Sequence, residues 1–307
     1  MGLNIIYENT DITKYVNVTK CLCRDVSCGR ADSVEIEFDH AAVWHSWNPQ
    51  EDDTITVMLD GYSTGKMYVS AIVPEGDKFR ILATALPSAA RRKAWAVYRD
   101  MTLGEIMHNS AVEIGMDTVL YGISDSIKYA CIMRENEGCA AFLNNLGKCE
   151  GVALKACNGK FRGIYIPYAQ GLDAVQKLHI DTTQDGVIYT RQENKKISTL
   201  TVLSPYARVN ATDTAATKGN AATITTLPAM NAVQAGRWAR GILLSINRQA
   251  ERLTVKSTFN PAMAAMVRVD VEGTGKMAGA WIVDEVEHDL VNLKTEIAAL
   301  RVITTMQ

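Results

Sequence analysis

Residues 57–73 read VMLDGYSTGKMYVSAIV, and residues 269–283 read VDVEGTGKMAGAWIV. Each stretch has a short apolar run, a turn made of an acidic residue and glycine, and then a second apolar run. The turn leads into the same tetrapeptide, Thr64-Gly65-Lys66-Met67 in one copy and Thr274-Gly275-Lys276-Met277 in the other. A third apolar run follows each copy, at residues 79–86 and 293–302. Because four identical residues hold the same place in the same strand–turn–strand–turn–strand frame, we predict a duplicated β-module near the two ends of the chain.

The composition is that of a soluble globular protein. The chain has 307 residues, of which 47% are hydrophobic and 21% are charged, enough for two or three domains with their own cores. Its formal net charge is −2, so it lacks the basic excess with which proteins neutralise phosphates, and we expect no specific nucleic-acid binding. No apolar run approaches the about 18–20 residues of a membrane span, and no signal-peptide pattern opens the chain. We expect synthesis in the cytoplasm and no membrane segment.

The seven cysteines do not have the spacing of a metal site. Cys21, Cys23 and Cys28 lie close together, and the other four are spread over residues 131–157. Zinc sites usually combine two Cys-x2–4-Cys pairs or a Cys pair with a His pair, whereas this chain has only Cys-x-Cys without a histidine partner. We therefore expect reduced structural thiols, no metal and no cofactor.

An early segment alternates strictly between apolar and acidic residues. Val34, Ile36 and Phe38 take one parity of residues 32–39, and Glu35, Glu37 and Asp39 take the other. This is the period of a strand with one dry and one wet face. The three acidic side chains form a row of like charge, so we expect them on a solvated or lumen-facing surface. Trp44 and Trp47 follow, and they either close the end of a barrel or anchor a partner.

The middle of the chain changes to a helical period. Thr102-Leu103-Gly104-Glu105 has the form of a capping box, and it predicts a helix that ends at Gly115. A second helix is expected over residues 136–150. Asn158-Gly159 separates two β-prone runs, which predicts a hairpin over residues 152–167. Residues 94–172 are therefore expected to form a small α+β domain.

Strands resume in the last third of the chain. Residues 178–182, 187–192 and 197–203 are expected to supply the early strands of a second β-domain. The Ala/Thr/Asn-rich stretch 209–230 is weakly patterned and predicts an exposed arm or loop. Asn231 is placed to cap a helix that runs through residue 247.

The sequence offers no recognisable catalytic motif. It has no nucleophile elbow, His-Glu-x-x-His, phosphate-binding glycine loop or dinucleotide fingerprint. His288 lies among acidic residues and could hydrogen-bond a carboxylate, but a single histidine at a strand–turn is most often structural. Trp238, Trp281 and His288 are therefore candidates for structural or interface positions. We expect a protein that is not an enzyme.

The order of several motifs resembles that of the baseplate hub proteins of contractile phage tails, of the late control D type, which are also similar to the hub part of type VI secretion spike proteins. The early strand Asp32–Asp39 precedes Trp44 and Trp47. The Thr-Leu-x-x-Ile helix at residues 102–106 precedes a Phe-Leu-x-x-Leu helix at residues 142–146. Late in the chain, Asn260-Pro261 is followed by a strand ending in Val-x-x-Val-x-His at residues 283–288.

This resemblance implies a fold and an assembly. The fold would be α+β and mainly β, with two similar antiparallel β-barrel tube domains, residues 1–93 and 173–307, and the α+β domain 94–172 inserted between them. The second barrel would carry the arm and helix at about residues 207–250. The chain would form a homotrimer whose six barrels make a pseudo-sixfold ring, joining the hexameric tail tube to the trimeric central spike among other baseplate proteins of a phage or tailocin particle.

Within that ring, Glu35, Glu37 and Asp39 would face the lumen, and the two Thr-Gly-Lys-Met segments would be equivalent turns of the two barrels. Two other functions remain open at this point. One is a tail-associated cell-wall hydrolase, and the other is a glycan- or receptor-binding tail module with exposed Trp44 and Trp47.

Overall fold

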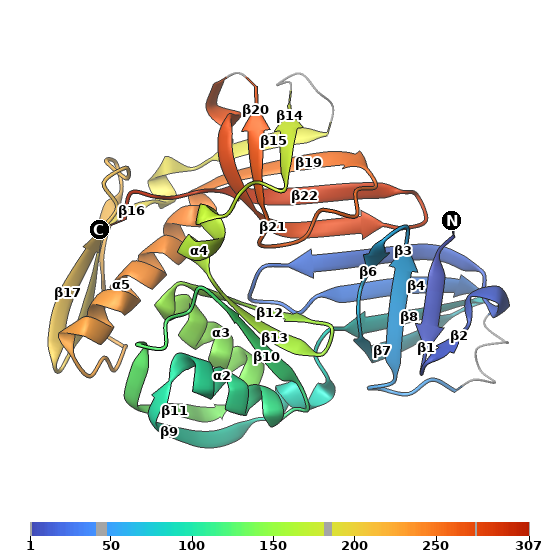
Figure 1. Ribbon diagram of the computed structural model, residues 1–307, viewed down its shortest axis with the longest axis horizontal. Coiled ribbons are helices and arrows are strands. Elements are labelled where there is room, and N and C mark those ends of the chain that lie inside the picture. Colours follow the sequence, from blue (N-terminus) through green and yellow to red (C-terminus); the bar gives the residue numbers. More distant parts are fainter. Residues whose placement is uncertain (1, 41–47, 181–185, 274, 307) are drawn as a thin grey trace.

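A computed structural model describes residues 2–40, 48–180, 186–273 and 275–306 of the chain (Figure 1). Strands predominate over helices, and most strand pairs are antiparallel, so the predicted α+β, mainly β class is confirmed. None of the helices in these residues combines the length and the apolar content that a membrane crossing requires.

Six main strands near the N-terminus form a first sheet unit. They are β1 (Asn4–Tyr7), β3 (Val18–Val26), β4 (Ser33–Asp39), β5 (Thr54–Leu59), β7 (Met67–Glu75) and β8 (Lys78–Thr84), with the two-residue strands β2 (Thr10–Asp11) and β6 (Tyr62–Ser63) beside them. Hydrogen bonding places them in the order β1-β5-β7-β8-β4-β3. Counted along the chain, this is the order first, fourth, fifth, sixth, third, second.

Six strands in the last part of the chain form a second sheet unit. They are β14 (Gln176–His179), β15 (Val187–Arg191), β19 (Glu251–Thr258), β20 (Arg268–Glu272), β21 (Gly279–Asp289) and β22 (Lys294–Arg301). Their order is β14-β20-β21-β22-β19-β15, which is again first, fourth, fifth, sixth, third, second. The units differ in one pairing, because β1 runs antiparallel to β5 whereas β14 runs parallel to β20. The permuted order is shared although the connecting segments differ in length.

The two units are joined into one continuous sheet. Residues 285–289 of β21 pair antiparallel with residues 22–26 of β3, so that the orange strands of Figure 1 continue into the blue ones. This junction occupies the second edge of β3, and within the described residues no pairing links β3 to β1 or β15 to β14. Closure of each unit into a barrel by strand pairing is therefore not observed, and the predicted barrels are not confirmed.

Alternation along the strands sends the apolar side chains to one face. Val34, Ile36 and Phe38 of β4 are buried as predicted, in a core that continues into the helices of the middle region. The second unit has a core of its own around Trp281, which is fully buried. Because successive side chains of a strand point to opposite faces, the residues between the buried ones lie on the solvent-facing side of the sheet, where polar side chains are favoured.

The middle region contains the predicted α+β elements. They are β9 (Ala94–Thr102), α2 (Leu103–Val112), β10 (Asp117–Tyr121), β11 (Lys128–Glu137), α3 (Cys139–Glu150), β12 (Val152–Cys157), β13 (Lys160–Tyr165) and α4 (Ile166–Gly171). Both bonds of the capping box form, Glu105 N–H to Thr102 Oγ1 at 3.2 Å and Thr102 N–H to Glu105 Oε2 at 2.7 Å. The β12–β13 hairpin turns at Asn158-Gly159, as predicted. The domain limits 94 and 172 stay a prediction.

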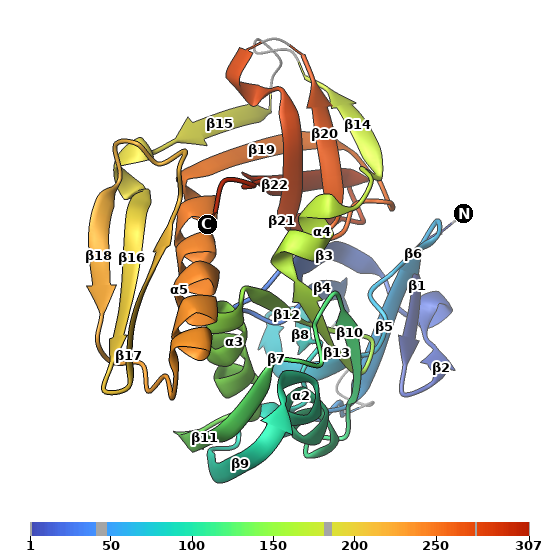
Figure 2. The ribbon, with the colours of Figure 1, turned by 60° about the vertical axis from the view of Figure 1, so that its left-hand side comes forward.

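The expectation of an exposed arm at residues 209–230 is wrong. A three-stranded sheet forms there from β16 (Ile197–Ser204), β17 (Ala207–Thr212) and β18 (Asn220–Ile224), so that β16 is not an early strand of the second unit. It packs on α5 (Ala232–Asn247), which Asn231 caps as predicted (Figure 2). Ala211 and Ala235 are buried at this contact. Small side chains thus form a packed layer whose composition resembles that of a loop.

Helix α5 also lies against α3, and a glycine permits the close approach. A Cβ at Gly241 would lie 2.2 Å from the carbonyl oxygen of Cys149 and 2.4 Å from the backbone nitrogen of Gly151. A glycine that lowers helix propensity is therefore explained by the distance between the two helix backbones.

Candidate functional site

The candidate site is the face of the continuous sheet that is turned away from its apolar cores. We call it the polar face, and define it by the charged residues that strand register places on one side of the six consecutive strands from β8 to β19. They are Lys78 and Arg80 of β8, Glu35, Glu37 and Asp39 of β4, Lys20 and Arg24 of β3, Glu285, Glu287 and Asp289 of β21, Lys294 and Glu296 of β22, and Arg252 and Lys256 of β19. Cationic and anionic strands alternate across it, except that β22 carries one charge of each sign.

Ion pairs connect neighbouring strands of the polar face in the first unit. Glu35 Oε1 lies 2.8 Å from Lys20 Nζ and 3.4 Å from Arg80, and Glu37 Oε1 lies 2.7 Å from Lys78 Nζ. The predicted row of like charge is therefore matched by cations from the strands on either side. These pairs are partly solvated, so each contributes little stability by itself, but together they leave few charges uncompensated.

The same pattern crosses the junction. Arg24 Nε of β3 lies 2.6 Å from Glu287 Oε2 of β21, which ties together strands more than 250 residues apart. Further along, Arg252 lies 3.5 Å from Glu285, and Lys256 lies 3.2 Å from Glu296. The polar face is thus one charge-balanced surface that spans both units.

The ion pairs of Glu35 and Glu37 favour the charged form of these two side chains. Burial opposes the ionisation of Glu35, but the hydrogen bonds and charges of Lys20 and Arg80 outweigh it and lower the pKa of Glu35. Hydrogen bonds from Lys78 and Thr19 lower the pKa of Glu37. A general acid needs a carboxyl that stays protonated near neutral pH, and neither residue meets that requirement.

A buried ionic cluster lies beneath the junction. Lys155 of β12 donates to Asp25 of β3, and its Nζ lies 2.7 Å from Asp32 Oδ2, where Asp32 is the last residue before β4. Burial raises the pKa of Asp32 to about 6 despite the opposing charge of Lys155. Burial also opposes the charged form of Lys155, but the two carboxylates outweigh it and raise the pKa of Lys155. The cluster fixes the middle region to the sheet.

Sequence reasoning missed this cluster. The only signal was a lysine inside the apolar run Val152–Cys157, where a charge is unexpected. Its partners come from residues 25 and 32, so no local pattern identifies them. Nearby, Asp284 accepts from Ser27 at 2.5 Å and pairs with Arg248 at 2.9 Å, which adds a second link across the junction.

The tryptophans and the histidine chosen from the sequence are buried where the structure describes them. Trp238 Nε1 donates to Glu150 at 2.8 Å, and Trp281 Nε1 donates to the Met277 carbonyl at 2.8 Å. Trp44 and Trp47 lie outside the described residues.

His288 is fully buried, and among the described residues it bonds no carboxylate. Its Nδ1 lies 2.9 Å from Thr295 Oγ1 and its Nε2 lies 3.3 Å from the Met263 carbonyl, and burial lowers its pKa. Because burial favours its neutral form and both ring nitrogens already have partners, His288 is a structural residue.

The two Thr-Gly-Lys-Met segments occupy the same place in the two sheet units, before β7 and before β21. Gly65 and Gly275 both have left-handed φ angles, 65° and 82°, and Met67 and Met277 are both buried. Thr274 lies outside the described residues.

The surroundings of the two segments differ. The Lys66 N–H donates to Asn158 Oδ1 at 3.0 Å, so the first segment rests on the β12–β13 turn. In the second, the Lys276 carbonyl accepts from the Arg301 guanidinium. Each segment is thus fixed by a different part of the chain.

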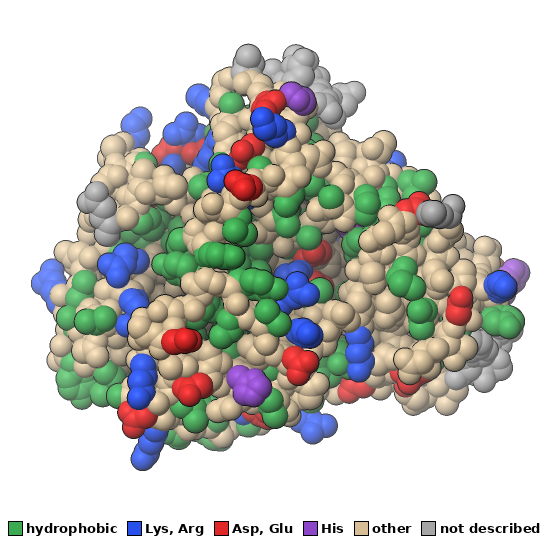
Figure 3. Space-filling view, viewed as in Figure 1, with side chains coloured by type: hydrophobic (Ala, Val, Ile, Leu, Met, Phe, Trp, Pro, Cys, Tyr) green, Lys and Arg blue, Asp and Glu red, His purple; other side chains and the backbone are tan. Residues whose placement is uncertain are grey.

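The surface seen in Figure 3 carries acidic and basic side chains interspersed, with no large patch of one sign. All seven cysteines lie in described segments and are free thiols. Across the residues that the structure places, no group of three or more His, Cys, Asp or Glu side chains could hold a metal ion.

No protein-family model and no curated protein matches the sequence. Solved structures do match. The 43 kDa tail protein of prophage MuSo2 from Shewanella oneidensis has a TM-score of 0.75 at 13% identity, covering 98% of both chains. The tail protein from Neisseria meningitidis MC58 has a TM-score of 0.75 at 12% identity, covering 98% of this chain and 97% of that one.

A third structure comes from a secretion system. The E. coli c3393 protein is described as a component of the type VI secretion system that is structurally similar to T4 bacteriophage tail proteins gp27 and gp5. It has a TM-score of 0.57 at 13% identity, covering 94% of this chain and 74% of that one. The chain therefore has the fold of phage tail proteins and of this secretion component, which confirms the predicted resemblance at the level of fold.

Proposed function

We propose that the chain is the structural, non-enzymatic hub of a contractile phage tail or tailocin baseplate, of the late control D type. In this proposal three chains form a ring that joins a hexameric tail tube to a trimeric central spike. The observation that carries it is the pair of sheet units with one shared, permuted strand order. Three copies of a chain with two similar units present six similar units, which suits a sixfold partner on one side and a threefold partner on the other.

The junction inside the chain suggests how the ring closes. In it, the C-terminal half of β21, the fifth strand of the second unit, pairs with β3, the second strand of the first unit. The corresponding elements at the other ends are the C-terminal half of β7 and strand β15. Within the described residues, β15 pairs only with β19, and residues 71–75 of β7 pair only with β8. We expect β7 of one chain to meet β15 of the next.

Two features of these edges support the expectation. Ile188 of β15 is 59% exposed, and strand register places it beside Thr254 at the open edge of the polar face, where a strand paired from a neighbouring chain would pack against its flank. Pro74 of β7 lacks an N–H, so it is suited to a sheet edge and would keep the ladder between chains short. Ring closure would remove both open edges.

The polar face would line the lumen of this ring. The polar face is continuous across the junction, and ion pairs between its strands balance most of its charge. A lining of this kind would attract polyanionic DNA weakly, since binding to phosphates requires uncompensated cations. Glu35, Glu37 and Asp39 would therefore be lumen residues, whereas the lowered pKa values of Glu35 and Glu37 oppose a hydrolase at this face.

Light scattering coupled to size exclusion tests the proposal, with the chain alone and mixed with the tube and spike proteins of the same particle. We expect a mass near three times the 33.7 kDa of one chain. Ile188→Asp should weaken the trimer, whereas Val233→Asp, which changes a 71% exposed residue at the start of α5, should not. A monomer under all these conditions would refute the hub. A trimer that Ile188→Asp does not weaken would refute only the edge pairing.

A further inference from the structure

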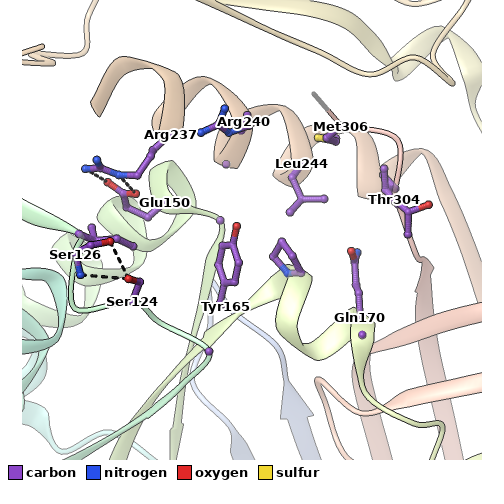
Figure 4. Close-up of a pocket in the computed structure, with 17 residues that line it drawn as sticks. Ser124, Ser126, Glu150, Tyr165, Gln170, Arg237, Arg240, Leu244, Thr304 and Met306 are labelled. Atoms are coloured by element: carbon purple, nitrogen blue, oxygen red, sulfur yellow. Dashed lines mark hydrogen bonds and ion pairs between the residues drawn. The ribbon is translucent and has the colours of Figure 1, made fainter. Parts of the chain in front are cut away.

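A pocket of about 560 Å³ lies between α5, α4, the loop around residues 122–127 and the C-terminal residues 303–306. Its volume falls within the about 300–1,000 Å³ of sites that bind small ligands or side chains. Figure 4 shows that α5 lies above it and that Tyr165 and α4 lie below it. The pocket is separate from the polar face, because none of the residues that define that face line it.

One side of the pocket is already neutralised. The Glu150 side chain is 1% exposed and accepts from Tyr129 Oη at 2.6 Å, Trp238 Nε1 at 2.8 Å and Arg237 Nε at 3.0 Å. Burial raises the pKa of Tyr129, and the negative charge of Glu150 raises it further. Glu150 and Arg237 therefore satisfy each other and leave no charge for a ligand.

Three other lining residues have polar groups without a partner in the described part of the chain. Gln170 is only 7% exposed, yet its side-chain amide makes no hydrogen bond there. Arg240, one helical turn after Arg237, forms no ion pair, and the Tyr165 hydroxyl makes no hydrogen bond among these residues. In Figure 4 the Gln170 amide and the Tyr165 hydroxyl both point up toward α5. Because these polar groups have no protein partner and face the pocket, a ligand bound there can supply one.

The chemistry of these groups defines a complementary ligand. Arg240 supplies a positive charge that Glu150 does not compensate, so it favours a single carboxylate. The Gln170 amide both donates and accepts, which matches a peptide group. Leu244 and Pro167 also line the pocket and add apolar surface to its wall. One unpaired cation is a poor match for a phosphate or a nucleotide, which would need more positive charge.

We propose that this pocket binds a peptide segment of a partner chain that carries a carboxylate next to an apolar side chain. The carboxylate pairs with Arg240, the adjoining peptide group bonds to Gln170, and the apolar side chain lies against Leu244 and Pro167. This site is independent of the ring interface and of the assembly proposed above.

Saturation-transfer NMR on the full-length protein tests the site with two small probes, N-acetyl-phenylalanine and N-acetyl-phenylalaninamide. Both have the amide and the aromatic side chain, but only the first has the carboxylate. We expect the acid to bind with a dissociation constant of roughly 1 mM, the range for ligands of this size. The amide should bind about ten- to hundredfold more weakly, as for the loss of a hydrogen bond to a charged group.

Variants separate the site from non-specific binding. Arg240→Met should weaken the binding of N-acetyl-phenylalanine about ten- to hundredfold. It should not affect folding, because Arg240 is exposed. Gln170→Leu should weaken both probes. Arg99→Met removes an exposed arginine on β9 and is the matched control, which should change neither affinity. Equal binding of acid and amide, full binding by Arg240→Met, or no binding of either probe at 10 mM (roughly ten times the expected constant) would overturn the proposal.

Discussion

Replacing Lys155 by methionine removes the cation that faces Asp25 and Asp32 beneath the sheet junction. The Lys155 and Asp32 side chains are 6% and 7% exposed, and Asp25 is 18% exposed, so water cannot replace the missing charge. Breaking a buried ion pair by removing one partner costs about 3–5 kcal/mol, since it leaves an uncompensated charge. We expect Lys155→Met to lower the free energy of unfolding by about this amount.

The triple variant Lys155→Met, Asp25→Asn, Asp32→Asn tests the cause. It removes all three charges, while the side-chain amide oxygen introduced by Asp32→Asn can still accept from the Val26 N–H, which bonds Asp32 Oδ1 at 3.0 Å in the native protein. Because neutral replacement of a buried ionic cluster is often tolerated, we expect the triple variant to regain most of the lost stability.

Urea titration followed by tryptophan fluorescence and circular dichroism measures both effects. Lys20→Met is the control, since it breaks the Lys20–Glu35 pair on the partly solvated polar face and should cost only about 0–1 kcal/mol. The reasoning fails if Lys155→Met costs no more than Lys20→Met. It also fails if the triple variant is no more stable than the single one.

Three further predictions concern single sites, each measured by the free energy of unfolding. Gly241→Ala should cost at least about 1–3 kcal/mol, because its Cβ would meet the Cys149 carbonyl at 2.2 Å, whereas Gly171→Ala has open space and should be nearly neutral; equal losses would contradict this. Thr102→Ala should cost about 0.5–2 kcal/mol by removing the capping bond to α2, and an unchanged stability would argue against the cap. Burial lowers the pKa of His288, so the unfolded chain binds this proton first, and stability should fall as pH drops below about 6.5. The His288→Gln variant should lack the loss of stability that His288 protonation causes. Identical pH profiles of the variant and the native protein would exclude a contribution from His288.

Local features of the chain were predictable because their causes are local. The alternation of Val34, Ile36 and Phe38 fixed a strand and its dry face. The Thr102–Glu105 capping box and the Asn158-Gly159 turn each depend on atoms a few residues apart, and both formed where expected. The repeated Thr-Gly-Lys-Met pointed to two similar units, and both units do have the same strand order.

Only the acidic residues of the candidate site could be predicted from the sequence. Glu35, Glu37 and Asp39 could be placed on one wet face from their spacing alone. Their cations could not be placed, because Lys20 and Lys78 reach them only through strand pairing. The expected acidic row is therefore a charge-balanced surface.

What the tertiary structure alone decided is which distant segments meet. The pairing of β3 with β21, the contact of Lys155 with Asp25 and Asp32, and the packing of residues 197–224 on α5 all join residues far apart in the chain. A strand edge can pair with any other strand edge, and small side chains such as Ala211 pack only if a partner of matching shape is near. The sequence by itself determined those strands and turns that have a strong local pattern, whereas the strands of residues 207–224 and the choice of partners depended on the free energy of the whole fold.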